Sequence, residues 1–335
     1  MRALDPMHRT EQSPPAPTGE VRAEAWHHRD DPLAPGPPGR FVTGVRALGT
    51  AVVLMAIHHL VLQLMAWGYI AYFRVRYPEV IQKLLLECPD PNAFALKLAE
   101  VSDLSTVASL LAMPLLIILY VTIIVIKHRR HDPIVLWEHV SRKQAFHAFI
   151  VLLGTVGITQ LWVMLLASFD IQTAIGRRFQ EYMERMQAFA VDQETSIWNF
   201  VAVAVLVPIA EELLFRGLVH GAMRRAFRPP VAITLTTVLF AVFHLDLIQG
   251  SYVLIAGWVL TLVYHWTENL AVPIVMHALF NFIGSGWLIR WTGADERAET
   301  IFVYVLYGCI ALAVVSLYFL RRHHRARVQA RGEAM

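Results

Sequence analysis

The sequence is poor in charged residues. Only 16% of its 335 residues are Asp, Glu, Lys or Arg, and 56% are hydrophobic, whereas a soluble domain carries about a quarter charged residues. The mean hydropathy is +0.48. A deficit of charge matters only if the apolar residues cluster, and here they form long runs. The composition therefore argues against an ordinary soluble enzyme and favours an integral membrane protein.

Cysteine and strong net charge are also scarce. The two cysteines, Cys88 and Cys309, lie in different segments, which indicates neither a disulfide framework nor a thiolate metal site. The formal net charge of +3 is too small to indicate a nucleic-acid partner. Residues 1–40 are polar and rich in proline, and they lack the apolar run of a signal peptide. We therefore expect no nucleic-acid binding and a disordered N-terminal tail over residues 1–40.

Two common hydrolase signatures are missing as well. The sequence contains no HExxH pattern, which excludes the zinc helix of that class of metalloprotease. Gly284-Ser285-Gly286 lacks the preceding glycine of a GxSG nucleophile turn, and we interpret it as small residues that allow close helix packing. Any peptidase chemistry must therefore come from other residues.

What the sequence does contain is a series of apolar runs. A helix needs roughly 20 apolar residues to cross the hydrocarbon core of a bilayer. The expected spans are Ala47–Phe73, Leu104–Ile126, Gln144–Phe169, Ile197–Met223, Pro229–Leu245, Leu247–Thr267, Leu270–Ile289 and Ile301–Leu320. We expect an all-α polytopic bundle of about eight transmembrane helices over residues 41–322, followed by a basic C-terminal tail over residues 323–335.

Lysine and arginine gather at the ends of these runs. Clusters occur before the first span at Arg46, after the second at residues 127–130, after the fourth at Arg224-Arg225 and after the eighth at Arg321-Arg322. With an even number of spans, all four clusters fall on one face, which the positive-inside rule makes cytoplasmic. We expect both termini in the cytoplasm, a location in a bacterial inner membrane, and membrane lipids as partners of the basic clusters.

The connection over residues 170–196 mixes charges with spaced apolar side chains. Ile175, Phe179, Tyr182 and Met186 are interleaved with the charged residues. This pattern favours an amphipathic helix on the outer surface of the membrane, with a simple connector as the alternative.

The fourth expected span carries the most informative anomaly. Glu211, Glu212 and Arg216 lie within it, where each charge costs roughly 2.5–3.5 kcal/mol on insertion scales. Glu212 and Arg216 are four residues apart and can pair on one helix face. Glu211 is rotated away by about 100°, and a carboxylate left facing a cavity suits a general base acting on water. The alternative is one buried salt-bridge cluster without chemistry.

Histidine and asparagine occur in two neighbouring spans. His244 lies in the fifth span, and His277 and Asn281 share one face of the seventh at an i, i+4 spacing. Two polar groups on one face indicate a shared lining, whereas a lone histidine is often an ordinary core residue. We interpret five further histidines as core residues of that kind: His58, His59, His147, His220 and His265.

These residue types are suited to amide hydrolysis without a nucleophilic side chain. One carboxylate and two imidazoles from three helices can hold an activated water, directly or through a divalent metal. Asn281, alone or with His277, can donate hydrogen bonds to the oxyanion of a tetrahedral intermediate.

Three motifs in this order resemble those of the CPBP family of intramembrane proteases, which includes the type II CAAX prenyl endopeptidases and the bacterial Abi proteins. The motifs are Glu211-Glu212 with Arg216, Phe240 with His244, and His277 with Asn281. They cover about residues 195–290, well under half of the chain. The resemblance implies a membrane-embedded endopeptidase whose substrate is a peptide or a membrane-tethered protein.

The resemblance also implies a role for each residue. Glu211 and His244 would activate the water, and His277 and Asn281 would stabilise the oxyanion. Glu212, Arg216 and Phe240 would support the site. The family is described both as metalloproteases and as metal-free glutamate enzymes. A divalent metal such as zinc, bound by Glu211, His244 and His277, therefore stays open, since these ligand types match an open zinc site.

Helix geometry places these residues at unequal depths. At about 1.5 Å per residue from the cytoplasmic ends, Glu211 and Asn281 lie roughly 18 Å deep, His277 roughly 12 Å and His244 roughly 24 Å. Helix tilt must close this gap if the two histidines are to share one water.

Two other functions use the same residues. A catalytically silent relative, acting as an immunity or scaffold protein, would keep the site for binding. A proton- or cation-coupled transporter would use Glu and His as a relay, although the sequence lacks broken helices in matched halves.

Overall fold

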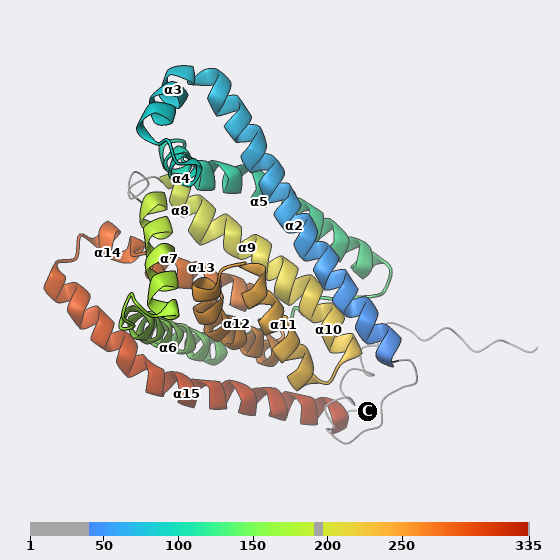
Figure 1. The fold of residues 1–335 in the computed structure, drawn as a ribbon. Coiled ribbons are helices and arrows are strands. Elements are labelled where there is room, and N and C mark those ends of the chain that lie inside the picture. Colours follow the sequence, from blue (N-terminus) through green and yellow to red (C-terminus); the bar gives the residue numbers. More distant parts are fainter. Residues whose placement is uncertain (1–39, 191–196, 334–335) are drawn as a thin grey trace, which may run out of the picture.

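The computed structural model describes residues 40–190 and 197–333, and within them every expected span is helical (Figure 1). Six stretches of the described residues are long and apolar enough to cross a membrane. They are α2 (Arg40–Arg76), α5 (Leu104–Arg129), α6 (Arg142–Ala167), the composite helix Ile197–Ala226, α12 (Leu247–Thr267) and α15 (Glu296–Glu333). The prediction of an all-α polytopic membrane protein is confirmed. Apart from Arg40, the expected N-terminal tail lies outside the described residues.

The fifth and seventh expected spans are shorter than predicted. Helices α11 (Pro229–Phe243) and α13 (Ala271–Gly284) have 15 and 14 residues. Helix α11 ends because Leu245 adopts a left-handed conformation, with φ of 53°. After α13, Gly286 adopts φ of 73° and the chain restarts as α14 (Trp287–Thr292). The interpretation of Gly284-Ser285-Gly286 as packing residues was wrong, because Gly286 serves the turn and a Cβ on Gly284 would meet no described atom within 4 Å.

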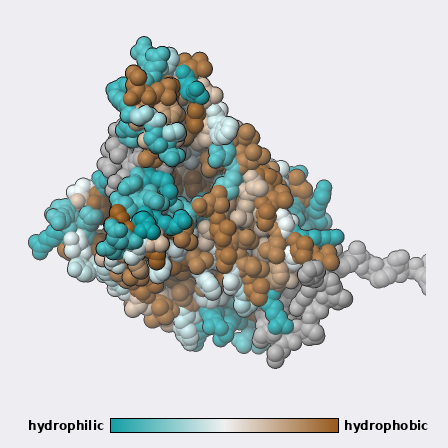
Figure 2. Space-filling view, in the orientation of Figure 1, coloured by the Kyte–Doolittle hydropathy of each residue, from teal (hydrophilic) through white to brown (hydrophobic). Residues whose placement is uncertain are grey.

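Helices also cover the end of the bundle opposite the basic clusters. Two short helices, α3 (Pro78–Glu87) and α4 (Pro91–Val101), follow α2. The amphipathic helix expected within residues 170–196 is confirmed as α7 (Ala174–Ala190). It is joined to the start of α12 by a Tyr182–Tyr252 hydroxyl hydrogen bond of 2.8 Å and by an Arg185–Asp246 ion pair. Figure 2 shows hydrophilic residues gathered over α3, α4 and α7, with hydrophobic residues across the middle of this face.

Within the described residues, two large hydrophobic clusters form the core of the bundle, beside smaller clusters at α3, α4 and α7. One joins α2, α5 and α11 to the composite helix Ile197–Ala226, around Leu116, Leu214 and Phe215. The other joins α6, α12, α13 and α15, around Leu152, Val263 and Leu306. The charged residues of the composite helix lie where these two groups of helices meet, because α13 and α12 pack against it from the second group.

Glycine allows α6 and α15 to pack closely. A Cβ on Gly154 would lie 2.6 Å from the Cys309 carbonyl oxygen, and one on Gly157 would lie 2.5 Å from the Leu306 carbonyl oxygen. Small residues at such positions let the backbones of membrane helices approach each other.

The basic helix ends gather on one side of the molecule, where the start of α2 and the ends of α5, α10 (His220–Ala226) and α15 lie (Figure 1). Residues 323–333 of the expected basic tail continue α15 as a helix. Arg327 and Arg331 donate to Glu268 in the α12–α13 turn, at 3.4 and 3.2 Å. The turn predicted at Glu268-Asn269 is present, with Glu268 left-handed at φ of 54°. The end of α15 therefore helps to fix the start of α13.

Candidate active site

The helix that carries the two glutamates is irregular on both sides of them. Within Ile197–Ala226, α8 (Ile197–Phe200) leads into a π-helical stretch, η2 (Val201–Leu206). Helix α9 (Val207–Glu212) then bears Glu211 and Glu212, and a second π-helical stretch, η3 (Leu213–Val219), bears Arg216. π-Helical turns are rare and occur often at functional sites. Their presence here marks the same segment that the charges marked in the sequence.

Proline explains one contact in this irregular region. In η2 the Val207 N–H donates to the Ala202 carbonyl, five residues back. The next bond in that register would run from residue 208 to the Val203 carbonyl, but Pro208 has no N–H. The Asn281 side-chain amide donates to the Val203 oxygen instead, at 2.9 Å. Asn281 thus replaces a missing backbone donor, and its second amide N–H is not used by this bond.

A buried charge cluster joins the composite helix to α13. The predicted pair is present: Arg216 Nη1 donates to Glu212 Oε1 at 2.6 Å, and both side chains are fully buried. His277 Nδ1 lies 2.8 Å from the same Glu212 oxygen. Arg216 Nη2 also donates to the Gly257 carbonyl of α12, at 3.0 Å. Glu212 and Arg216 therefore hold three segments together, which agrees with a supporting role.

The ring of Phe240 is the hub of the site. The Arg216 Cζ lies over its face, 4.4 Å from the ring centroid, as in a cation–π contact. The imidazoles of His244 and His277 approach the same ring at right angles, with centroids 5.1 and 5.9 Å away. A Cβ on Gly257 would lie 2.7 Å from Phe240 Cδ1, so only glycine leaves room for the ring there.

The hydrogen-bond partners assign a tautomer to each site histidine. A carboxylate and a carbonyl oxygen can only accept. His277 therefore carries a proton on Nδ1, which faces Glu212, and its Nε2 points toward Glu211 Oε2 at 3.9 Å. His244 carries a proton on Nδ1, which donates to the Phe240 carbonyl at 2.9 Å. Its Nε2 keeps the lone pair when the ring is neutral.

The structure brings the predicted site residues together to different degrees. Glu211 and His277 face each other, and His277, Glu212 and Arg216 are in direct contact. His244 is linked to the group through Phe240, on which both histidines pack. Asn281 lies one helical turn beyond His277, against the composite helix.

The side chains as they lie do not form a metal site. Nowhere in residues 40–190 and 197–333 do three His, Cys, Asp or Glu side chains converge closely enough to hold a metal ion. Nδ1 of His277 faces Glu212 and Nδ1 of His244 is bound to a backbone carbonyl, so only Nε2 of each ring could bind an ion. Because Glu211, His244 and His277 do not converge in the described residues, their arrangement does not fit the expected zinc site.

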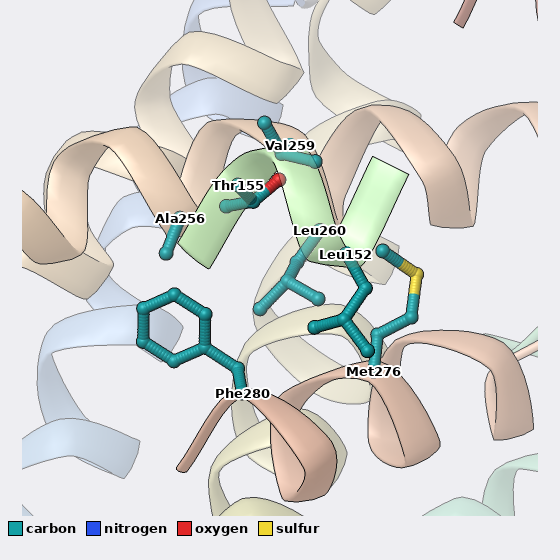
Figure 3. Close-up of a pocket in the computed structure, with 7 residues that line it drawn as sticks. All are labelled: Leu152, Thr155, Ala256, Val259, Leu260, Met276 and Phe280. Carbon is teal, nitrogen blue, oxygen red and sulfur yellow. The ribbon is translucent and has the colours of Figure 1, made fainter. Parts of the chain in front are cut away.

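A separate apolar cavity lies behind α13. In Figure 3, Met276 of α13 lies beside Leu152 of α6, and the Phe280 ring of α13 points toward Ala256 of α12. The Thr155 hydroxyl donates to its own helix, at the Val151 carbonyl. The cavity offers no charged side chain for chemistry, so the polar cluster around Glu211 is the candidate active site.

Several contributors could not be predicted from the sequence alone. The Gly257 and Val203 carbonyl groups bind site side chains but carry no signal of their own. Pro208 is visible in the sequence, yet its consequence depends on the helix around it being π-helical. His58 and His59 of α2 were interpreted as core residues, and they reach the end of α11 beside His244.

Comparison with known proteins adds independent evidence. Residues 193–283 match the family model described as type II CAAX prenyl endopeptidase Rce1-like. This segment contains all three motifs. The chain is also 25% identical over 185 residues, 53% of this chain and 73% of the relative, to the membrane-embedded CAAX protease MroQ of Staphylococcus aureus (strain USA300). No solved structure matches the chain significantly.

The resemblance to the CPBP family is confirmed. The Rce1-like segment starts just before α8 and ends within α13, so it includes the composite helix, α11 and α12. Both comparisons support a membrane protease. The helices α2, α5, α6 and α15 lie outside the segment and surround it.

Proposed function

We propose that this protein is an intramembrane endopeptidase in which Glu211 and His244 activate a water molecule for attack on a peptide bond. The proposal rests on the different partners of the two glutamates, Glu211 and Glu212. Arg216 pairs with Glu212, whereas Glu211 Oε2 faces His277 Nε2 across 3.9 Å. That distance is too long for a direct hydrogen bond, and a gap of this kind between polar groups is suited to a bridging water.

The reaction begins with proton transfer from water to Glu211. The carboxylate takes one proton while the water oxygen forms a bond to the carbonyl carbon of the substrate. His244 Nε2 accepts a hydrogen bond from the second hydrogen and orients the water, because its Nδ1 proton is held by the Phe240 carbonyl. When the C–N bond breaks, Glu211 returns its proton to the leaving amine nitrogen.

The oxyanion of the tetrahedral intermediate is stabilised by His277 and Asn281. With a proton on each nitrogen, His277 donates from Nε2, while Nδ1 stays bound to Glu212. Glu211 is protonated by then, so the charges of Glu212 and the oxyanion are balanced by the Arg216 guanidinium and this imidazolium, which lowers the cost of burying them. Asn281 donates with the amide N–H that does not bind Val203. Removing one such donor typically costs about 10²–10³ in kcat.

The substrate class follows from the surroundings of the site and from the relatives. Glu211 and His277 are nearly buried among apolar helices, so the reactive peptide must enter from the membrane or its surface. The relatives are described as CAAX proteases. A peptide or protein tethered to the membrane by a lipid or a hydrophobic segment is the substrate that fits. We place the basic helix ends in the cytoplasm of a bacterial cell, against anionic lipids.

The test compares the membrane proteome of cells that carry the wild-type chain with that of cells carrying Glu211→Gln. The substitution keeps the size of the side chain and removes the general base. We expect new protein termini in the wild type that are missing from the variant, at equal expression. Equal termini in both strains would overturn the proposal. A phenotype kept by both Glu211→Gln and His244→Ala would favour the silent immunity or scaffold protein, and ion flux in liposomes without cleavage would favour the transporter.

A further inference from the structure

Two adjacent histidines of α2 lie against the end of α11, outside the Rce1-like segment. His59 Nε2 lies 3.0 Å from the Phe243 carbonyl oxygen, and the His59 ring packs on the Phe243 ring with centroids 4.4 Å apart. The oxygen can only accept, so His59 donates this bond. Phe243 is the last residue of α11 and immediately precedes His244.

The Phe243 carbonyl needs such a partner because the helix ends there. The last four carbonyl oxygens of an α-helix receive no hydrogen bond from an N–H of the same helix. The chain turns sharply at Leu245, with φ of 53°, and α12 begins at Leu247. The His59 side chain thus caps the end of α11 at the point from which His244 projects.

The other histidine, His58, contacts Phe243 and the hydroxyl of Tyr120 in α5. His58 is 2% exposed, and its ring meets the edge of Phe243 with centroids 4.9 Å apart. Its Nδ1 lies 3.2 Å from the hydroxyl of Tyr120 in α5, a fully buried side chain. Tyr120 belongs to the same hydrophobic core as Ala210, the residue that precedes Glu211. Helix α5 packs directly on α9, which carries Glu211.

We propose that His59, and His58 together with Tyr120, are positioning residues of the active site: His59 fixes His244, and the His58–Tyr120 pair borders Glu211. None of the three is placed in contact with the substrate. The inference rests on the proposed function, because it assigns these residues to the pair that activates water. Under this inference, α2 and α5, which lie outside the Rce1-like segment, help to position the residues that activate the water.

The physical reason is the precision that water activation requires. A displacement of about 1 Å at a reacting group can cost about 10²-fold in rate even when the altered residue is distant. The backbone N–H groups of His244 and Leu245 bond back to Ala241 and Val242, at 3.3 and 3.1 Å, which holds the turn to the end of α11. His59 supplies a hydrogen bond there and a stacked ring.

The experiment uses the full chain in liposomes, with a quenched fluorescent peptide tethered through a prenylated cysteine and a second one tethered by a transmembrane segment. The variants are His59→Leu, His59→Gln and Tyr120→Phe, with Glu211→Gln as the inactive reference. His147→Leu is the matched control, since His147 Nδ1 bonds Ser316 between α6 and α15 at 3.2 Å, outside the candidate active site. Turnover, KM and the thermal midpoint in detergent are measured for each.

We expect His59→Leu to lower kcat by about 10-fold or more with KM within about 2-fold, because the position of a reacting group changes and substrate binding does not. His59→Gln should return to within about 3-fold of the wild type, since the Gln amide can donate to the same carbonyl. Tyr120→Phe should lower kcat by about 3- to 10-fold, also without a change in KM. His147→Leu should cleave like the wild type.

Two results would overturn the inference while leaving the proposed function intact. One is His59→Leu with wild-type kcat, and the other is His59→Gln with no recovery over His59→Leu at an unchanged thermal midpoint. If His59→Leu does not fold, the test rests on Tyr120→Phe, which removes only one oxygen atom and should fold. A wild-type kcat for Tyr120→Phe would then contradict the inference. A wild-type chain that cleaves neither probe faster than Glu211→Gln would overturn the proposed function itself.

Discussion

The side-chain amide of Asn281 donates to the Val203 carbonyl at 2.9 Å, in the place of the backbone N–H that Pro208 lacks. One residue therefore holds α13 against the composite helix and keeps a second amide N–H for the proposed oxyanion contact. This double use couples the stability of the bundle to the geometry of the proposed oxyanion donor.

A double-mutant cycle separates the two uses of Asn281. Asn281→Ala should lower the free energy of unfolding by about 1–3 kcal/mol, because the Val203 carbonyl is left unpaired. Pro208→Ala supplies a backbone N–H in the same register, so Asn281→Ala combined with Pro208→Ala should recover much of that loss. Activity should not recover, because the oxyanion donor is still missing. Thermal or denaturant unfolding in detergent and liposome cleavage assays measure the two effects, and additive losses of stability would argue against the backbone role.

The buried pair of Glu212 and Arg216 should be costly to break from one side. Arg216→Met leaves a buried carboxylate without its cation and should cost about 3–5 kcal/mol. Combining it with Glu212→Gln removes both charges and should restore part of the stability. Unfolding of the purified chain in detergent measures this.

The matched control is Lys83→Met, which breaks the exposed pair of Lys83 and Glu87, also four residues apart. An exposed pair contributes about 0–1 kcal/mol. Arg216→Met with a loss as small as that of Lys83→Met would show that the buried pair does not support the site.

Gly257 should tolerate no side chain. In Gly257→Ala the added Cβ would lie 2.7 Å from Phe240 Cδ1, so the ring on which Arg216 and both site histidines pack must move. Overpacking of this kind typically costs about 1–3 kcal/mol, and cleavage should fall with it. Gly308→Ala in α15 is the control, because no atom of the described chain lies within 4 Å of its added Cβ. Equal cleavage activity of the two alanine variants would contradict the claim that the position of the Phe240 ring matters to the site.

Asp132 gives a pH dependence outside the membrane-spanning segments. Burial alone would raise the pKa of this carboxyl, but Arg225 at 2.6 Å and then Lys127 outweigh burial and hold the pKa below its usual value. A lowered pKa in the folded state stabilises the protein above the unfolded value of about 3.9, and the contribution is lost as the pH falls through the lowered value. Asp132→Asn should therefore lower the free energy of unfolding at pH 7 by about 1 kcal/mol or less, as for a pair exposed to solvent, and the thermal midpoint should fall with it.

The difference between Asp132→Asn and the wild type should narrow as the pH falls below about 3.9, because the Asp132 carboxyl then progressively takes up a proton and comes to resemble the uncharged Asn. A difference that stays constant from pH 7 to pH 3 would mean that the ion pair between the ends of α5 and α10 contributes nothing. Thermal scans in detergent at several pH values provide the measurement.

Local spacing was enough to predict part of the site. The Glu212–Arg216 pair follows from an i, i+4 spacing on one helix, and the α12–α13 turn at Glu268-Asn269 follows from two charge-free runs separated by polar residues. The hydrophobic runs likewise predicted where the long apolar helices lie, but not the short helices α3 and α4. These features depend on the helical period and on the thickness of a bilayer, both of which can be applied to a single sequence.

Other features depend on contacts between distant segments, which spacing does not encode. Nothing in the sequence links His277 to Glu212, or His59 to Phe243, because those bonds depend on how the helices cross. The depth estimate placed His244 far from His277, since it treated α11 and α13 as straight helices of full span. Both helices are shorter, and both histidines pack on Phe240.

The most direct test of the account is cleavage by the purified chain in liposomes, with mass spectrometry of the products from the two tethered peptides. The account predicts that wild type hydrolyses an internal peptide bond and that Glu211→Gln, at an equal thermal midpoint, falls to the background rate. Hydrolysis by Glu211→Gln at the wild-type rate would contradict the claim that Glu211 activates the water.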